Sequence, residues 1–191
     1  MPTTVTVASK DIGVAGAVQD VFMNERFRVY TLDDVIGVEL GGALKNIIAL
    51  GAGISDGMGY GDNTKAALMT RGITEMARLG VCLGAKRETF FGLSGIGDLI
   101  VTCTSLHSRN RRCGIMIGEG LGPVEAIKRV GMIVEGVPTA EAARLLALKM
   151  EIEMPITEAI CRIVEGEAPP DVELAALMTR EKKHENDRRG C

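Results

Sequence analysis

The spacing of apolar residues first predicts a short unit of strand, helix and strand. Residues 3–9 alternate β-branched and small side chains, and residues 27–31 read FRVYT, both of which are typical of strands. Residues 12–23 have the spacing of a helix, with four apolar side chains on one face: Val14, Val18, Val21 and Phe22. Because two strands leave open edges and an uncovered face, we expect this unit to be the last part of a larger parallel sheet.

From Asp33 onward the pattern changes to apolar residues at helical spacing. The pair Asp33-Asp34 is a good N-cap for a long helix over residues 35–55. Further helices are predicted over residues 63–83, 108–119, 123–129, 139–150, 156–164 and 171–178. The predicted fold is therefore mainly α. Its expected parts are the last unit of a larger parallel sheet (residues 1–33), an all-α domain (34–180) and a flexible tail (181–191).

Composition narrows the class of protein. The hydrophobic fraction of 46% and the charged fraction of 25% are ordinary for a globular protein. A net charge of -3 and an aromatic content of 3% give little support to nucleic-acid binding. The five cysteines form no CxxC pair, which argues against a zinc site and a disulfide framework. We therefore expect a cytoplasmic protein with no metal and no membrane span.

The segment Gly37–Asn46, GVELGGALKN, is the first candidate for chemistry. Each of its three glycines costs a helix about 1 kcal/mol relative to alanine, so something is expected to approach the backbone closely there. Lys45 follows in an apolar stretch, where we expect its stem to be buried, and its amine is a candidate for proton transfer. The alternative is a lysine that extends its amine into solvent.

Two further segments carry candidate side chains. GLSGIGDL over residues 92–99 matches neither a Walker loop nor GxGxxG. Asp98 within it is most simply a helix N-cap, although such a carboxylate can also hold a hydroxyl or a lysine. Ser108, Arg109 and Asn110 open a predicted helix and offer a cap, a guanidinium and free backbone N–H groups, which suit a phosphate monoester. The alternative is that the three arginines of this segment, Arg109, Arg111 and Arg112, form a solvated face or a salt-bridge cluster.

Taken together, four stretches resemble the bacterial-type NAD(P)-dependent glycerol-3-phosphate dehydrogenases. They are residues 37–80, FFGLSGIGDLIVTCTSLHSRNRRCG over residues 90–114, IVEGVPTA over residues 133–140 and MPIT over residues 154–157. The resemblance runs from about residue 2 to residue 180. It implies a nucleotide-binding Rossmann domain for NAD or NADP, of which residues 1–33 are the remnant. It also implies that residues 34–180 are an all-α substrate-binding and catalytic domain similar to that of 6-phosphogluconate dehydrogenase. It also implies interconversion of dihydroxyacetone phosphate and sn-glycerol 3-phosphate, which supplies phospholipid synthesis, and it leaves a homodimer possible.

The resemblance assigns roles to particular residues. Lys45 matches the catalytic lysine, which exchanges a proton with the substrate oxygen. The matching substrate-binding residues are Lys45, Asn46, Asp98, Thr102, Ser108, Arg109 and Asn110. The matching cofactor-binding residues are Arg109, Ile133 and Glu135.

The N-terminus departs from the family pattern, because it has no GxGxxG and no acidic residue for the ribose. We therefore expect an incomplete chain that is inactive alone. The alternative is a non-catalytic helical interaction or dimerisation module, in which the glycine-rich helix is a packing seam. Side chains of Lys45, Asp98 and Arg109 on one cleft favour the enzyme, whereas scattered ones favour the module.

Overall fold

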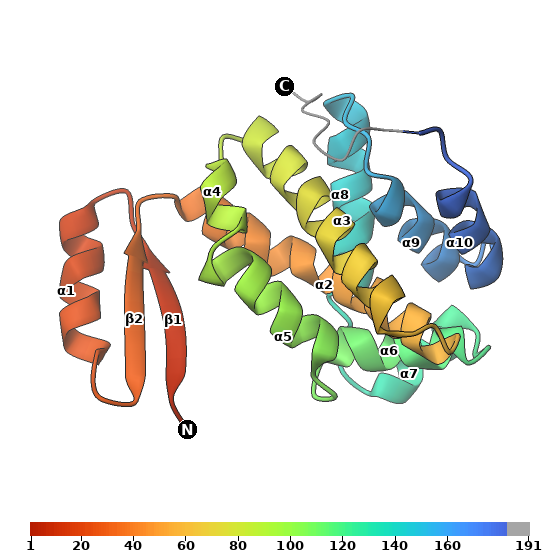
Figure 1. Cartoon of the computed structure of the whole chain (residues 1–191), viewed down its shortest axis with the longest axis horizontal. Helices are drawn as coiled ribbons and strands as arrows, with labels where there is room; N and C mark the ends of the chain where they lie inside the picture. The colour runs from red at the N-terminus through yellow and green to blue at the C-terminus, as the bar shows by residue number, and fades with distance from the viewer. Residues whose placement is uncertain (183–191) are drawn as a thin grey trace.

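The computed structural model describes residues 1–182, so the predicted tail lies almost entirely outside the described residues. Strand β1 (Thr3–Ala8), helix α1 (Ile12–Phe22) and strand β2 (Phe27–Leu32) form a β-α-β unit at one end of the molecule (Figure 1). The strands are parallel, with Thr3 opposite Phe27. The predicted strand, helix and strand are all present.

Helix α1 covers the two strands through a small contact. Ala15 is fully buried, and the side-chain amide of Gln19 donates a hydrogen bond of 2.7 Å to the carbonyl of Val29 on β2. The large apolar side chains Val21 and Phe22 are exposed. The β-α-β unit therefore presents an apolar surface to its surroundings, which soluble domains usually cover.

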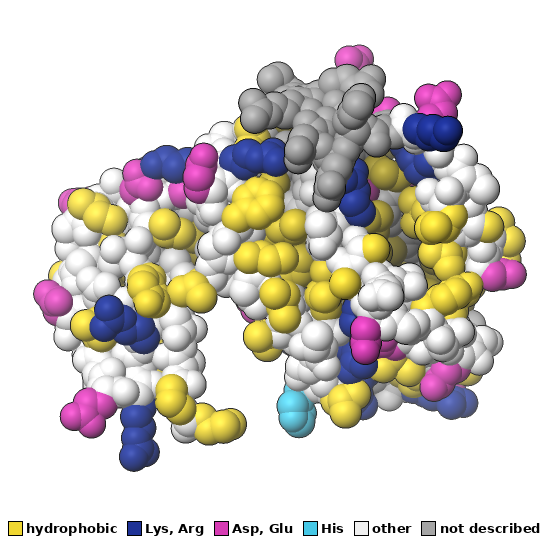
Figure 2. All heavy atoms as spheres, viewed as in Figure 1, with side chains coloured by type: hydrophobic (Ala, Val, Ile, Leu, Met, Phe, Trp, Pro, Cys, Tyr) yellow, Lys and Arg dark blue, Asp and Glu magenta, His cyan; other side chains and the backbone are white. Residues whose placement is uncertain are grey.

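The rest of the described chain is helical. Its elements are α2 (Val35–Gly57), α3 (Asp62–Cys82), α4 (Arg87–Phe90), the π-helix η1 (Leu93–Gly97), α5 (Asp98–Thr104), α6 (Arg109–Gly118), α7 (Pro123–Val130), α8 (Gly136–Lys149), α9 (Pro155–Glu165) and α10 (Pro170–Met178). The mainly α fold is confirmed, and the predicted helices match the observed ones to within one to three residues at their ends. Figure 2 shows a hollow between the β-α-β unit and the helical part, with apolar side chains over α4 and α5 beside it.

Helix α2 is the centre of the helical part, and α3, α5, α6, α8 and α9 pack against it. Asp34 caps it as predicted, because its carboxylate accepts a 2.9 Å hydrogen bond from the backbone N–H of Gly37. By length and composition α2 is apolar enough to cross a membrane. However, every residue from Asn46 to Ser55 is buried within the molecule, which is typical of the core helix of a helical domain.

Glycines allow α2 to approach its neighbours within the same chain. A Cβ on Gly53 would lie 2.1 Å from the carbonyl oxygen of Arg111 on α6, and one on Gly114 would lie 2.1 Å from that of Leu50. Glycine at these positions therefore brings the backbones of α2 and α6 into contact. The packing seam that the sequence suggested is internal to the chain, which removes the main argument for an interaction module.

Gly41 and Gly42 provide a test of this packing. A Cβ on Gly41 would lie 2.7 Å from the carbonyl oxygen of Ser94, whereas nothing lies within 4 Å of one on Gly42. We expect Gly41→Ala to lower the free energy of unfolding by about 1–3 kcal/mol, because backbone atoms of η1 must shift. Gly42→Ala is the matched control and should raise it by about 0.5–1 kcal/mol. Urea titration of both variants measures the difference, and equal effects would contradict the close contact.

Candidate functional site

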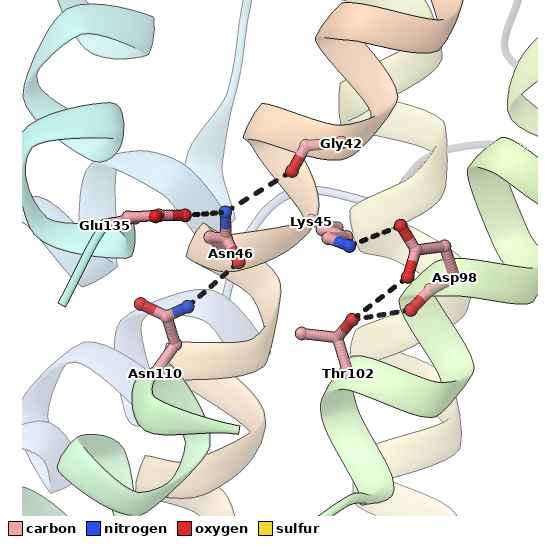
Figure 3. A network of polar contacts seen from close by, with 7 residues as sticks. All are labelled: Gly42, Lys45, Asn46, Asp98, Thr102, Asn110 and Glu135. Atoms are coloured by element: carbon pink, nitrogen blue, oxygen red, sulfur yellow. Dashed lines mark hydrogen bonds and ion pairs between the residues drawn. The ribbon is translucent and has the colours of Figure 1, made fainter. Parts of the chain in front are cut away.

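Lys45 lies on the face of α2 that meets α5, and its amine forms an ion pair with the carboxylate of Asp98 (Figure 3). The Lys45 side chain is 19% exposed, so its amine reaches the surface but is held by a partner. It is not the freely solvated lysine of the alternative interpretation. A partly shielded amine with a fixed direction is suited to act at a bound substrate.

The interpretation of Asp98 as a helix cap is wrong. The N-cap residue of α5 is Gly97, and no side chain caps this helix end. Since η1 ends at Gly97 with helical dihedral angles and continues directly into α5, there is no extended residue whose side chain could turn back to cap the helix. The carboxylate of Asp98 is thus available for Lys45.

Thr102 lies one turn further along α5, beside the same pair. Its hydroxyl donates a hydrogen bond of 2.7 Å to the backbone carbonyl of Asp98, and its oxygen lies 3.5 Å from the carboxylate oxygen Oδ1. Thr102 therefore borders the side of Asp98 that Lys45 leaves open (Figure 3).

Asn46 and Asn110 form a second, buried set of contacts that joins three helices. The Asn46 amide nitrogen donates to the carbonyl of Gly42 at 3.3 Å and to Oε2 of Glu135 at 3.2 Å. Its oxygen accepts from the Asn110 amide at 2.9 Å, and the Asn110 oxygen accepts from the backbone N–H of Gly136 at 2.8 Å. Because both amide protons of Asn46 are engaged, its role in this structure is to fix α2 against α6 and α8 next to Lys45.

Ser108 and Arg109 lie at the start of α6, as predicted. The Ser108 hydroxyl caps the helix by accepting a 3.3 Å hydrogen bond from the backbone N–H of Arg111. The side chain of Arg109 is 38% exposed, and its Nη2 lies 3.7 Å from Oε1 of Glu135. Arg111 points elsewhere and forms an ion pair of 2.7 Å with Asp56. Of these two arginines, Arg109 is the one that lies near another predicted site residue, Glu135.

The loop before α8 supplies the last predicted residues. Glu135 joins the contacts of Asn46 to Arg109, because one carboxylate oxygen accepts from Asn46 and the other faces Arg109. Ile133 is 73% exposed, and no polar contact ties it to the rest of the site. The structure thus places eight of the nine predicted residues in two sets that adjoin where Lys45 and Asn46 are neighbours on α2, and it leaves Ile133 exposed outside both. The sets are Lys45, Asp98 and Thr102, and Asn46, Asn110, Glu135 and Arg109 with Ser108 at the start of α6. The sequence did not predict the two hydrogen bonds that involve backbone groups, namely the carbonyl of Gly42 with Asn46 and the N–H of Gly136 with Asn110.

The chemistry available here is that of an amine, two carboxylates, a guanidinium and the free N–H groups of a helix start. This set can exchange a proton and bind an anionic group. Among residues 1–182 no group of three or more His, Cys, Asp or Glu side chains is arranged to hold a metal ion.

Comparison with known proteins decides the family. A family model for the C-terminus of NAD-dependent glycerol-3-phosphate dehydrogenase matches residues 34–175. The chain belongs to this dehydrogenase family. The resemblance inferred from the sequence motifs is therefore confirmed.

Relatives of the same name support this membership. The chain is 59% identical over 184 residues to glycerol-3-phosphate dehydrogenase (NAD(P)+) of Halalkalibacterium halodurans, an alignment that covers 96% of the chain and 53% of the relative. It is 61% identical over 185 residues to the protein of that name from Pelotomaculum thermopropionicum, covering 97% and 53%. The chain thus spans about half the length of the curated dehydrogenases that it matches.

A solved dehydrogenase structure also has this fold. The crystal structure of glycerol-3-phosphate dehydrogenase from Coxiella burnetii superposes with a TM-score of 0.89 at 44% identity, covering 94% of this chain and 55% of the other. The enzyme from Saccharomyces cerevisiae superposes with a TM-score of 0.81 at 27% identity, covering 91% and 54%. The helical arrangement around α2 is therefore that of the dehydrogenase family.

Proposed function

We propose that this chain is the substrate-binding and catalytic part of a cytoplasmic enzyme that interconverts dihydroxyacetone phosphate and sn-glycerol 3-phosphate with NAD(P)H. The product would supply phospholipid synthesis. The observation that carries the proposal is the ion pair of Lys45 and Asp98. It lies next to Asn46, which is hydrogen-bonded to Asn110 in the first turn of α6, where Arg109 also lies. These elements supply a proton donor and an anion-binding group for a phosphorylated ketone.

In this mechanism the Lys45 ammonium donates its proton to the carbonyl oxygen of dihydroxyacetone phosphate. When bound, the nicotinamide cofactor supplies the hydride to the carbonyl carbon. The positive charge of Lys45 also stabilises the negative charge that develops on the oxygen, so one side chain contributes acid catalysis and electrostatic stabilisation. In the reverse direction the neutral amine accepts the proton of the alcohol. Asp98 keeps the amine directed toward the site, and Thr102 borders the reacting hydroxyl.

The substrate phosphate is assigned to the start of α6. The backbone N–H groups of a helix start favour an anion, and the partly exposed guanidinium of Arg109 adds charge and direction. An arginine in the first turn opposes the helix dipole, so a bound anion would relieve an arrangement that is otherwise unfavourable. Ser108 holds this helix start by capping it, and Asn110 fixes it to Asn46.

Binding of NAD or NADP is assigned to Arg109, Ile133 and Glu135 at the edge of the same site. The partly exposed side chain of Arg109 and the half-exposed side chain of Glu135 fit the phosphate and hydroxyl groups of a dinucleotide, and the exposed Ile133 offers an apolar contact. The formation of a homodimer and the lack of a nucleic-acid partner stay predictions.

The function is tested by joining this chain to the complete nucleotide-binding half of a relative. We expect the joined protein to oxidise NADH or NADPH only when dihydroxyacetone phosphate is present, and residues 1–191 alone to show no turnover. Absorbance at the nicotinamide band measures the rate. A joined protein that binds the nucleotide but leaves dihydroxyacetone phosphate unreduced would contradict the proposal.

The role of Arg109 is tested in the same joined protein. We expect Arg109→Ala to raise the KM for dihydroxyacetone phosphate by about 10- to 100-fold, because a hydrogen bond to a charged group contributes about 1.5–3 kcal/mol. Arg112→Ala is the matched control, since Arg112 is exposed on the same helix. Steady-state kinetics compare the two variants. Equal KM values would show that the phosphate binds elsewhere.

A further inference from the structure

The outward face of α8 carries large apolar side chains that the rest of the described chain leaves uncovered. Leu145 and Leu148 on this helix are 58% and 69% exposed. The opposite face of α8 is buried against α2 and α9 through small residues, among them Ala140, Ala143 and Ala147. Because a helix with apolar side chains on both faces is usually covered on both, the outward face of α8 is a candidate interface.

Leu145 is the centre of this face, and it is flanked by opposite charges. An α-helix turns by about 100° for each residue, which places Leu145 on the side of α8 opposite the buried alanines. Glu141 and Lys149 lie one turn before and one turn after it, and both are exposed. Neither forms an ion pair within the described residues, whereas Arg144 on the same helix pairs with Glu165 at 2.6 Å.

This order of charges is complementary to itself. If two copies of α8 pack antiparallel around a two-fold axis at Leu145, residues at equal distances before and after Leu145 meet. Glu141 of each copy then faces Lys149 of the other, and the two Leu145 side chains meet at the centre. The antiparallel arrangement also aligns the two helix dipoles favourably. A parallel arrangement would instead place like charges against each other.

We propose that the chain forms a homodimer in which α8 packs antiparallel on α8 of a second copy, with Leu145 on the two-fold axis and a Glu141–Lys149 ion pair on each side of it. Charge complementarity thus identifies the second copy as the occupant of this face. One pair of 14-residue helices is a smaller interface than most stable complexes have, which bury about 1,200–2,000 Å². The dimer is therefore weak, with a Kd on the order of 10–100 µM.

The proposal is tested by reversing the charges and measuring the mass of the full chain by sedimentation equilibrium. We expect Glu141→Lys and Lys149→Glu each to weaken the dimer by about 10-fold or more, because each change turns two attractive pairs into two repulsive ones. A mixture of these two single variants should form a heterodimer with the affinity of the parent, because opposite charges then meet at both positions. The double variant should dimerise like the parent for the same reason.

Apolar substitutions separate this face from other exposed apolar surface. Leu145→Asp should abolish the dimer, because two carboxylates would meet on the two-fold axis. Val124→Asp on α7 is the matched control, since Val124 is 81% exposed and lies on another helix, and it should leave the Kd unchanged. Circular dichroism checks the fold of each variant.

Four results would overturn the proposal. The first is a parent chain that stays monomeric at about 1 mM, well above the expected Kd. The second is a mixture of the single charge variants that associates no better than either variant alone, and the third is a Leu145→Asp variant that dimerises like the parent. The fourth is a dimer that is lost in Val21→Asp, because Val21 is 77% exposed on α1 and the copies would then meet through the β-α-β unit.

Discussion

Replacing Lys45 with alanine is expected to lower the kcat for dihydroxyacetone phosphate reduction by about 10²- to 10⁴-fold, which is the usual contribution of a positioned acid. The structure supports this expectation because the amine is held by Asp98 at the edge of the site and is partly shielded from solvent. The assay requires the chain joined to a complete nucleotide-binding half. The fold of the variant is checked by circular dichroism.

Lys86→Ala is the matched control for the loss of a lysine from an ion pair. Lys86 pairs with Asp33 at 2.6 Å, but its side chain is 56% exposed and lies outside the site. Its removal should leave kcat within twofold of the parent, because exposed ion pairs contribute little. If Lys45→Ala behaves like Lys86→Ala, the proton must come from another group, and the mechanism fails even though the family assignment stands.

The sequence predicted the long helices well because their ends carry local signals. Asp34 and Ser108 cap α2 and α6 where the caps were expected, and prolines begin α7, α9 and α10. The segment from α4 to η1 has no such signal. Phe90 lies in this segment, and its ring fills the space left by Gly80, where a Cβ would lie 2.1 Å from it. Tertiary packing, not helical spacing, determines the short helices there.

The sequence indicated which residues belong to the candidate site, but it did not indicate which of them contact one another. Lys45 and Asp98 are 53 residues apart, and Asn46 and Glu135 are 89 apart. Local pattern favoured a cap for Asp98, because acidic residues are common at helix starts. The motifs of the dehydrogenase family indicated which residues matter. The contacts that join them depend on how α5, α6 and α8 cross α2.

Those crossings connect the fold to the proposed chemistry. The glycine contacts bring α6 against α2, which places Asn110 within hydrogen-bonding distance of Asn46. The backbone N–H of Gly136 then binds Asn110, so the loop that carries Glu135 is fixed to the same point. The start of α6 and the loop that carries Glu135 are thereby fixed to the residue next to Lys45 on α2.

A buried carboxylate on α3 fixes the start of α9 in a comparable way. Glu75 is 4% exposed and accepts hydrogen bonds from the backbone N–H groups of Ile156 and Thr157, at 2.7 and 3.1 Å, and from the Thr157 hydroxyl at 3.2 Å. Glu75→Ala would leave these donors buried without a partner. We therefore expect it to lower the free energy of unfolding by about 2–5 kcal/mol, as measured by urea titration.

Glu75 also predicts how stability changes with pH. Burial raises the pKa of Glu75 from 4.5 to about 7, against the opposing effect of its hydrogen bonds and of Arg78. Because the folded-state pKa lies above the unfolded one, the stabilisation from this group is complete below pH 4.5 and is lost as the pH rises to 7. The loss is up to about 3 kcal/mol, at about 1.4 kcal/mol per pKa unit.

The experiment measures the urea midpoint of unfolding at several values between pH 5 and pH 8. We expect Glu75→Gln to reduce the dependence of this midpoint on pH, whereas the exposed control Glu119→Gln should leave it as in the parent. If both variants keep the parent's slope, Glu75 does not titrate in this range, and its carboxylate is ionised throughout.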